Sequence, residues 1–490
     1  MQSLNEQLTG ITESFALVIP EMILAAGFLV ILVVGLFNNT KNIRFNFLTL
    51  LTTAGSFAFI LARGLEGNFV LFNGMLQREG FADFLMLLVD ASVALTCLMS
   101  WHNPEKRKLS EYYALILAIA LGSHVLLMSA NLLVIFLSLE LISISSYVLA
   151  AYAFDKPSSE GSLKYFLFGS IASAIMLYGF TILYGLTGTL EFNSAQFFNQ
   201  LTDHPSPMIL IAGLMGLSGF LFKMAAVPMQ PWAPDVYEAA PMPVIAYLSV
   251  APKLAAIGIL TKFLLALHLY GQGEYDWQTI IAAISILTIT VGNFSALWQK
   301  SPKRMMAYSS IAHSGFLLVG VAAFLPQGIH FMLFYASVYL LLNFAVFTYL
   351  HYFEIQGIRS MNSFAGTGKI FTWAAVGLTL GLVALTGIPP TAGFTAKLFI
   401  FSGLWEAYQD THKPLLVWLL IFGLLNTVVS LFYYLRIPYF AFIKAGEPRQ
   451  RQKKGDFENL LGFILVVLIV VIFFLPGLLM GLINRINFVL

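Results

Sequence analysis

Long apolar stretches alternate with short polar connections along almost the whole chain, and this pattern predicts membrane-spanning helices. A helix needs about 20 apolar residues to cross the hydrocarbon core of a bilayer. On that template the sequence holds about fourteen spans. Two of them contain several prolines and are longer than one crossing requires, so we expect broken helices there. The spans are predicted at 17–37, 45–62, 81–101, 112–129, 131–153, 162–187, 207–239, 243–268, 278–299, 305–325, 328–353, 370–409, 415–442 and 459–483.

Composition supports this interpretation, because 59% of the residues are hydrophobic and only 10% are charged. Soluble domains hold about a quarter charged residues, so the solvent of this chain is lipid. The single cysteine, Cys97, leaves no intrachain disulfide, Cys-rich zinc site or iron–sulfur cluster to expect. The eight histidines show no metal-ligand spacing, and no flavin or dinucleotide fingerprint is present. We expect an all-α polytopic membrane protein with no metal or cofactor of its own and no nucleic-acid partner.

The basic residues of the loops indicate how the spans are oriented. With the N-terminus outside, 17 lysines and arginines fall in cytoplasmic loops and 4 in the opposite loops, a strong positive-inside bias. Both termini are therefore expected on the outer side. The 17 are Lys41, Arg44, Lys106, Arg107, Lys108, Lys156, Lys164, Lys300, Lys303, Arg304, Arg359, Lys369, Lys444, Arg449, Arg451, Lys453 and Lys454, and the 4 are Arg63, Arg78, Lys413 and Arg485.

Five basic residues remain inside the predicted spans. Lys262 and Arg436 lie near span ends, where a long side chain can extend to the lipid headgroups, and we interpret them as interfacial anchors. Lys223, Lys253 and Lys397 lie deeper. An ammonium at mid-depth costs roughly 2.5–3.5 kcal/mol on the insertion scale, so such residues face protein-lined, hydrated cavities or a counter-charge.

Glu140, at the centre of the fifth predicted span, is the natural counter-charge. At about 4 Å and an effective dielectric near 20, a Lys–Glu pair attracts by about 4 kcal/mol. That is enough to change the protonation of a lysine when its partner moves or takes a proton, which would make the lysine a proton-loading site. The alternative is a static buried ion pair that locks two helices. Three lysines with one glutamate fit that alternative poorly.

Two proline-rich breaks lie beside these lysines. Lys223 is followed by Pro228, Pro231 and Pro234, whereas Pro389, Pro390 and Gly393 precede Lys397. Broken helices within lipid are tolerated only where the freed backbone faces protein or water. Paired breaks in two halves of a chain are typical of inverted-repeat transporters.

Other polar residues inside the spans can extend such a path. His313 can relay a proton through its two ring nitrogens, although a lone histidine in a membrane is about as often structural. Asp90 fits either a proton path or an acid kept neutral by burial. The secondary candidates are Asp90, Tyr335, Tyr339, Asn343 and Asn426.

Several long motifs resemble one family. They are NLLVIFLSLELISISSYVLAAY, SLKYFLFGSIASAIMLYG, VPMQPWAPDVYEAAPMPV, AYLSVAPKLAA and KRMMAYSSIAHSGF. They are similar to the antiporter-like membrane subunits of respiratory complex I over roughly residues 110–440. The segments APDVYEAAP, SVAPK and SSIAHSG resemble the N type rather than the M or L type.

The resemblance implies two inverted five-helix repeats, formed by spans four to eight and nine to thirteen. It implies three N-terminal helices at 1–110, repeats at 111–272 and 273–443, and a basic cytoplasmic loop with a last helix at 444–490. It assigns proton translocation to Glu140, Lys223, Lys253, His313 and Lys397. The family's usual histidine in the first break is Gln230 here, so that position loses any expected proton role.

The same resemblance implies that the chain would be a proton-translocating subunit of an NADH:quinone oxidoreductase in a bacterial cytoplasmic membrane. The complex would use NADH, FMN, iron–sulfur clusters and quinone in other subunits, and the neighbours would be lipids and the M-, K- and L-type subunits. Two alternatives remain open. One is an Mrp-type or stand-alone sodium/proton antiporter subunit, and the other is a non-conducting scaffold of the membrane arm.

Overall fold

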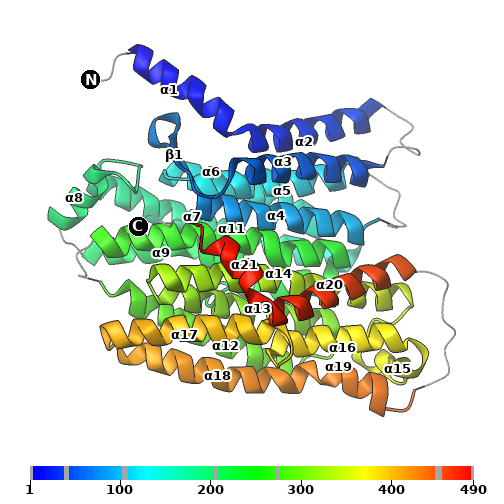
Figure 1. Cartoon of the computed structure of the whole chain (residues 1–490). Coiled ribbons are helices and arrows are strands. Elements are labelled where there is room, and N and C mark those ends of the chain that lie inside the picture. The colour runs from blue at the N-terminus through cyan, green and yellow to red at the C-terminus, as the bar shows by residue number, and fades with distance from the viewer. Residues whose placement is uncertain are drawn as a thin grey trace. The chain divides into compact units, whose positions relative to one another are not determined.

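A computed structural model of the chain describes residues 4–37, 44–101, 109–203, 207–270, 275–446 and 455–486. Within these ranges, 13 helices are long and apolar enough to cross a membrane. This confirms an all-α, integral, multi-pass membrane protein (Figure 1). The helices are α2 (Ile19–Phe37), α3 (Phe45–Arg63), α4 (Gly80–Met99), α5 (Leu109–Met128), α6 (Leu132–Ala150), α7 (Lys156–Thr187), α9 (Pro207–Met224), α11 (Met242–Tyr270), α12 (Trp277–Leu297), α13 (Pro302–Ala322), α14 (Pro326–Ile355), α18 (Pro414–Tyr434), which continues through α19 (Arg436–Pro438) and η4 (Tyr439–Ile443), and α20 (Asp456–Phe474).

Both proline-rich spans are broken where the sequence predicts. The first divides into α9 and the short helix α10 (Trp232–Ala239), and the second into α16 (Thr372–Thr386) and α17 (Ala392–Thr411). A proline inside a helix removes a backbone donor and clashes with the preceding turn, so each proline pair ends its helix. The predicted number of fourteen spans therefore corresponds to these 13 helices together with the α16–α17 pair.

Several short elements were not predicted, because they fall below the length of a span. They include a hairpin in which β1 (Asn68–Leu71) pairs antiparallel with β2 (Leu76–Glu79). The hairpin matters because the side chains of Arg78 and Glu79, at its end, are buried. The other short elements are α1 (Leu4–Leu17), η2 (Phe72–Gly74), α8 (Ala195–Asp203), η3 (Met361–Phe364) and α15 (Thr367–Ile370). The last span was predicted as one helix over 459–483, but it divides at Pro476 into α20 and α21 (Pro476–Ile483), because the proline cannot continue the helix.

The chain forms two compact units. The first comprises Met1–Met224, Ala251–Trp277 and Arg485–Leu490, and the second comprises Ala225–Val250 and Gln278–Asn484. In the first unit, α5 packs against α2 and α6, and α7 packs against α9. In the second, α14 packs against α16, α17 and α20.

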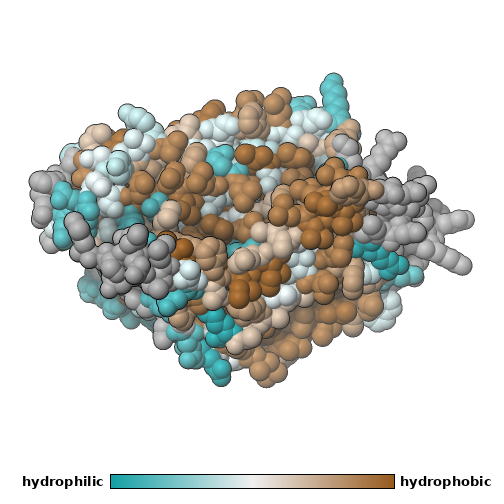
Figure 2. Space-filling view, turned by 90° about the horizontal axis from the view of Figure 1, so that it is seen from above, coloured by the Kyte–Doolittle hydropathy of each residue, from teal (hydrophilic) through white to brown (hydrophobic). Residues whose placement is uncertain are grey.

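The surface is apolar in a way that suits lipid. Helix α18, for example, exposes Leu424, Leu425, Val428 and Phe432. Hydrophobic residues, brown in Figure 2, cover large parts of the face shown there. In contrast, α11, α13 and α14 are almost completely buried. The buried helices α11 and α13 carry Lys253 and His313.

Candidate functional site

Lys223 lies in the last turn of α9, directly before the first break, and its side chain is almost completely buried. Its Nζ donates a long hydrogen bond of 3.4 Å to Tyr165 Oη. The amine also lies 5.3 Å from the ring centre of Tyr147 and 5.2 Å from that of Tyr165. Faces of aromatic rings attract cations. The described residues place no carboxylate within the 4.0 Å of an ion pair with this amine.

Glu140 lies on α6, two turns before Tyr147 and on the same helix face. The glutamate interacts electrostatically with Lys223 but forms no ion pair with it within the described part of the chain. One carboxylate oxygen, Oε1, is buried and accepts no hydrogen bond from the described residues. The static ion pair considered above for these two residues is therefore not formed in this conformation.

Gly169 on α7 leaves the space that the Tyr147 ring occupies beside Lys223. A Cβ at this position would lie 1.8 Å from Tyr147 Oη, so only a glycine allows Tyr147 to occupy its place. Tyr147 and Tyr165 meet edge to face, with ring centres 4.6 Å apart. The two tyrosines thus form a fixed aromatic frame around the amine.

Lys253 lies within α11, directly after Pro252, and is completely buried. Pro252 cannot donate the usual helical hydrogen bond, so the carbonyl one turn earlier loses that partner. Lys253 belongs to the first compact unit, together with Lys223 and Glu140, whereas His313 and Lys397 belong to the second.

Lys397 lies in the second turn of α17, directly after the second break, and is buried. Its Nζ donates a 2.7 Å hydrogen bond to the carbonyl of Thr386, the last residue of α16. The amine also lies 4.5 Å from the ring centre of Phe316. As with Lys223, no ion pair to a carboxylate is present among the described residues.

The second break depends on two glycines. Gly387 ends α16 with a φ of 87°, which favours glycine. A Cβ on Gly393 would lie 1.9 Å from the carbonyl oxygen of Ala384, so the start of α17 approaches the end of α16 more closely than any side chain allows. This close approach brings Lys397 within reach of a helix-end carbonyl.

His313 is the centre of a hydrogen-bonded group in the second unit. Its Nδ1 lies 2.6 Å from Tyr335 Oη, and its Nε2 lies 3.3 Å from Tyr434 Oη. Ser309 bonds to the same Tyr434 hydroxyl. Tyr339 bonds to Ser310 at 2.9 Å. Tyr335 and Tyr339 were predicted as secondary residues, whereas Tyr434 was not. Asn426 and Ser430 precede Tyr434 on α18 at intervals of four residues, and this polar spacing could have indicated it.

The remaining secondary residues have other partners. Asn343 donates to the carbonyl of Tyr339 on its own helix. Asn426 bonds to Asn293 and Thr290 on α12. Neither is joined to His313 by a hydrogen bond among the described residues.

A narrow gap separates His313 from Lys397 in the second unit. Its walls include Tyr335, Tyr339 and Leu385, and it is too small to admit a water molecule in this conformation. No hydrogen bond joins the His313 imidazole directly to the Lys397 amine among the described residues.

Lys262 is not an interfacial anchor, so that interpretation was wrong. The residue is 9% exposed, and its Nζ lies 2.9 Å from Glu79 Oε1 of the hairpin and 3.2 Å from the carbonyl of Leu127. The partner lies 183 residues away in the sequence, where no local pattern could indicate it. Arg436 donates to the carbonyls of Leu297 and Gln299, next to the end of α12.

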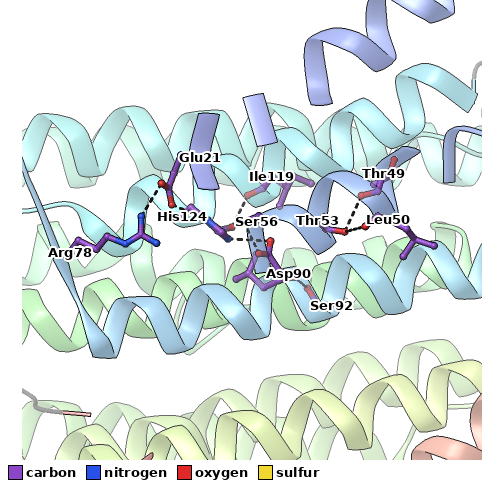
Figure 3. A network of polar contacts seen from close by, with 12 residues as sticks. Glu21, Thr49, Leu50, Thr53, Ser56, Arg78, Asp90, Ser92, Ile119 and His124 are labelled. Carbon is purple, nitrogen blue, oxygen red and sulfur yellow. Dashed lines mark hydrogen bonds and ion pairs between the residues drawn. The ribbon is translucent and has the colours of Figure 1, made fainter. Parts of the chain in front are cut away.

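Asp90 belongs to a buried polar group in the N-terminal helices and not to the lysine sites. Its partners are His124 and Ser56, and the group extends through Glu21 to Arg78 (Figure 3). Sequence analysis missed His124 and Glu21. Each is a lone polar residue within an apolar helix, which is the only signal that could have indicated them.

Comparison with known proteins places this architecture in a family. The model of the family described as NADH:quinone oxidoreductase/Mrp antiporter, transmembrane, matches residues 129–428. NADH-quinone oxidoreductase subunit N 2 of Chloroherpeton thalassium is 36% identical over 475 residues, which covers 94% of this chain and 92% of the relative. The chain belongs to the N-subunit family of NADH-quinone oxidoreductases.

Solved structures agree with this N-subunit fold. A chain of respiratory complex I from Thermus thermophilus with bound aureothin is 26% identical, with a TM-score of 0.80 over 96% of this chain and all of that one. A chain of an archaeal membrane-bound sulfane sulfur reductase is 23% identical, with a TM-score of 0.86 over 96% of each chain. The latter likeness shows the fold alone.

The range matched by the NADH:quinone oxidoreductase/Mrp antiporter model includes some of the polar groups and leaves out others. The matched range contains Glu140, Lys223, Lys253, His313 and Lys397. It begins at residue 129, after the buried group around Asp90 and His124. These two sets of residues are therefore separate both in sequence and in their hydrogen-bond partners.

Among the residues that the structure describes, no group of three or more histidine, cysteine, aspartate or glutamate side chains is arranged to hold a metal ion.

Proposed function

We propose that this N-family subunit translocates protons in the membrane arm of a NADH:quinone oxidoreductase, driven by quinone reduction in other subunits. The path would use Glu140, Lys223, Lys253, His313 and Lys397. One observation supports it most. The buried amines of Lys223 and Lys397 are each held by one neutral acceptor and by aromatic rings, and no carboxylate pairs with them in the described chain.

A buried ammonium without an ion pair has lost much of its hydration, which costs several kcal/mol even after relaxation of the protein. Its charged and neutral forms therefore lie close in free energy, and a nearby charge can decide between them. Glu140 supplies such a charge for Lys223. An amine held in this way can take up and release a proton during each cycle.

The dry gap between His313 and Lys397 supplies a gate. While it is closed, a proton cannot pass between the imidazole and the amine. A conformational change that hydrates the gap would open the path, and the energy for that change would come from the partner subunits. The gate prevents protons from leaking back between cycles.

The wider setting follows from the same proposal. Both termini would lie on the outer side of a bacterial cytoplasmic membrane, and M-, K- and L-type subunits would be the neighbours. NADH, FMN, iron–sulfur clusters and quinone would be bound by other subunits. Two inverted repeats, at 111–272 and 273–443, would each contribute one broken helix.

The proposal is tested by replacing Lys223, Lys253 and Lys397 with alanine, one at a time, in the assembled complex. Quinone reduction and proton uptake are measured in sealed vesicles. We expect pumping to fall in each variant, because each change removes one proton-carrying group. The control is Lys164→Ala, since Lys164 is only half-buried and pairs with the exposed Glu160 one turn earlier on α7. Full pumping in all three variants would contradict the proposal.

Purification tests the antiporter alternative, and the lysine variants test the scaffold alternative. A complex I subunit should co-purify with quinone reductase activity, whereas an antiporter subunit should exchange sodium for protons without it. A non-conducting scaffold would co-purify with the reductase, and the three lysine variants would still pump.

The close contact at Gly393 gives a second prediction. Gly393→Ala places a methyl group against the Ala384 carbonyl, so the start of α17 must shift. Overpacking of this kind costs about 1–3 kcal/mol, and here it also moves Lys397 from its carbonyl partner. We expect pumping to fall in vesicles, whereas Gly477→Ala, with open space around the new methyl group, leaves it unchanged. Equal pumping in the two variants would show that the break geometry is unimportant.

A further inference from the structure

A buried group of charged side chains lies in the N-terminal helices, apart from the lysine path. His124 on α5 is completely buried and lies between two carboxylates (Figure 3). Its Nδ1 is 3.2 Å from Glu21 Oε1 on α2, and its Nε2 is 3.3 Å from Asp90 Oδ1 on α4. Glu21 and Asp90 are themselves buried.

This arrangement requires an additional proton. A neutral imidazole carries one N–H donor and one acceptor nitrogen. If Nδ1 carries the proton and donates to Glu21, then the lone pair of Nε2 faces an oxygen of Asp90, which is repulsive. If Nε2 carries the proton instead, the lone pair of Nδ1 faces an oxygen of Glu21 in the same way. Nε2 and Asp90 Oδ1 lie at ion-pair distance, and neither atom has a hydrogen-bond partner in the described chain. This repulsion is removed when the imidazole is protonated on both nitrogens, or when one of the two acids carries a proton.

The other oxygens of the two acids are already held. Ser56 Oγ donates to Asp90 Oδ2 at 2.8 Å. Arg78 Nη1 donates to Glu21 Oε2 at 3.1 Å, and Arg78 Nε donates to Asp83 at 2.8 Å. The proton must therefore reside on His124 or on the two oxygens that face it.

The charges around His124 also favour an additional proton at this group. The acids Glu21, Asp83 and Asp90 are buried together, and Arg78 is the base that bonds directly to two of them. Arg63, at the end of α3, interacts electrostatically with Asp83 and Glu21 from further away. Glu79 on the hairpin is already paired with Lys262 of α11. A positive charge at His124 thus compensates the excess of carboxylates among these buried side chains.

We propose that Glu21, His124 and Asp90 form a proton-binding relay that is separate from the lysine path. The relay binds one proton more than a neutral histidine between two ionised carboxylates would hold. When the imidazolium gives its Nε2 proton to Asp90, Nδ1 keeps its own proton and donates to Glu21. When it gives the Nδ1 proton to Glu21, Nε2 faces Asp90 as a donor. The proton thus moves between the two acids across the ring, which is a known capability of imidazole.

The positions of Glu21 and Asp90 indicate from which end the relay exchanges its proton. Glu21 is the third residue of α2 and bonds to Arg78 at the end of the hairpin, so it lies at a span end. Asp90 is in the middle of the 20-residue helix α4. Beyond Asp90, the hydroxyls of Ser92, Thr96 and Ser100 donate to carbonyls of their own helix, which is their ordinary structural role. The relay therefore stores a proton that exchanges through the Glu21 end and does not cross the membrane.

The test is infrared difference spectroscopy on the whole complex at neutral pH. Spectra of His124→Gln, Asp90→Asn and Glu21→Gln are each subtracted from that of the unchanged complex. We expect either an imidazolium band lost in His124→Gln or a protonated-carboxyl band lost in one of the acid variants. His412→Gln and Asp410→Asn, both at exposed positions, serve as controls that lose neither. A neutral imidazole together with two ionised carboxylates would overturn the proposal.

A second measurement tests the proton at His124 even if His124→Gln fails to assemble. His124→Lys places a permanent cation between the acids, whereas His124→Gln places a neutral amide there. If the position carries the proton's charge, more complex should assemble with lysine than with glutamine. The opposite order, with glutamine tolerated and lysine rejected, would overturn the proposal if the spectra also show no protonated-carboxyl band from Glu21 or Asp90.

Discussion

Replacing Glu140 by alanine is expected to stop proton pumping while the complex stays assembled. The carboxylate acts on the Lys223 amine through space, without an ion pair that would hold α6 and α9 together. Removing it therefore breaks no strong contact. A change of about 1.4 kcal/mol in that interaction alters the protonation ratio of Lys223 tenfold. We expect vesicle pumping to fall at least about tenfold, by the same relation, with normal amounts of complex on a native gel.

Matched variants separate charge from packing at this position. Glu140→Gln keeps the shape and removes the charge, so it should lose as much pumping as Glu140→Ala. Glu160→Ala removes an exposed glutamate that pairs with Lys164, and it should have no effect. The double variant with Lys223→Ala should be no worse than Lys223→Ala alone, because both changes interrupt one step. Pumping at the original rate in Glu140→Gln would refute the assigned role.

Arg78→Met is expected to destabilise the N-terminal helices more than any surface change in this chain. The guanidinium is fully buried, and it bonds to Glu21, to Asp83 and to the carbonyl of Leu17. Methionine fills similar space but leaves two buried carboxylates without their cation. Removing one partner of a buried ion pair costs about 3–5 kcal/mol. The midpoint of thermal unfolding of the purified complex, followed for this subunit, should fall accordingly.

An exposed arginine supplies the control for this prediction. Arg359 is 77% exposed and reaches Glu354 only at 3.8 Å, so Arg359→Met should change stability by less than about 0.5 kcal/mol. Adding Glu21→Gln and Asp83→Asn to Arg78→Met should restore part of the lost stability, because no buried charge is then left uncompensated. If the triple variant is less stable than Arg78→Met, the ionic explanation fails.

Much of the fold follows from the sequence because membrane insertion depends on local hydrophobicity. Each span is recognisable from about 20 consecutive residues, without knowledge of its neighbours. The two broken helices were predictable for the same reason, since Pro228 and Pro231, or Pro389 and Pro390, act on the backbone of their own segment. Short elements such as the β1–β2 hairpin escaped prediction because they have neither the length nor the periodicity of a span.

The sequence also indicated which charges are unusual, but not what they contact. Lys223, Lys397 and Lys262 all appear as single charges in apolar runs. Only the tertiary structure showed that the first two lie against aromatic rings, whereas Lys262 forms an ion pair with Glu79. Asp90 was equally ambiguous until His124 was found beside it.

The sequence by itself therefore determined the membrane environment, the number and order of the membrane spans, the positions of the two proline-rich breaks and the candidate lysines. The tertiary structure decided which of these charges are paired, which are held by neutral groups, and that His124 lies between two acids. The reason is physical. The free energy of transferring a segment into lipid is a sum over neighbouring residues, whereas the charge state of a buried group depends on partners that folding brings together. Glu21 and His124 are 103 residues apart in the chain and 3.2 Å apart in the protein.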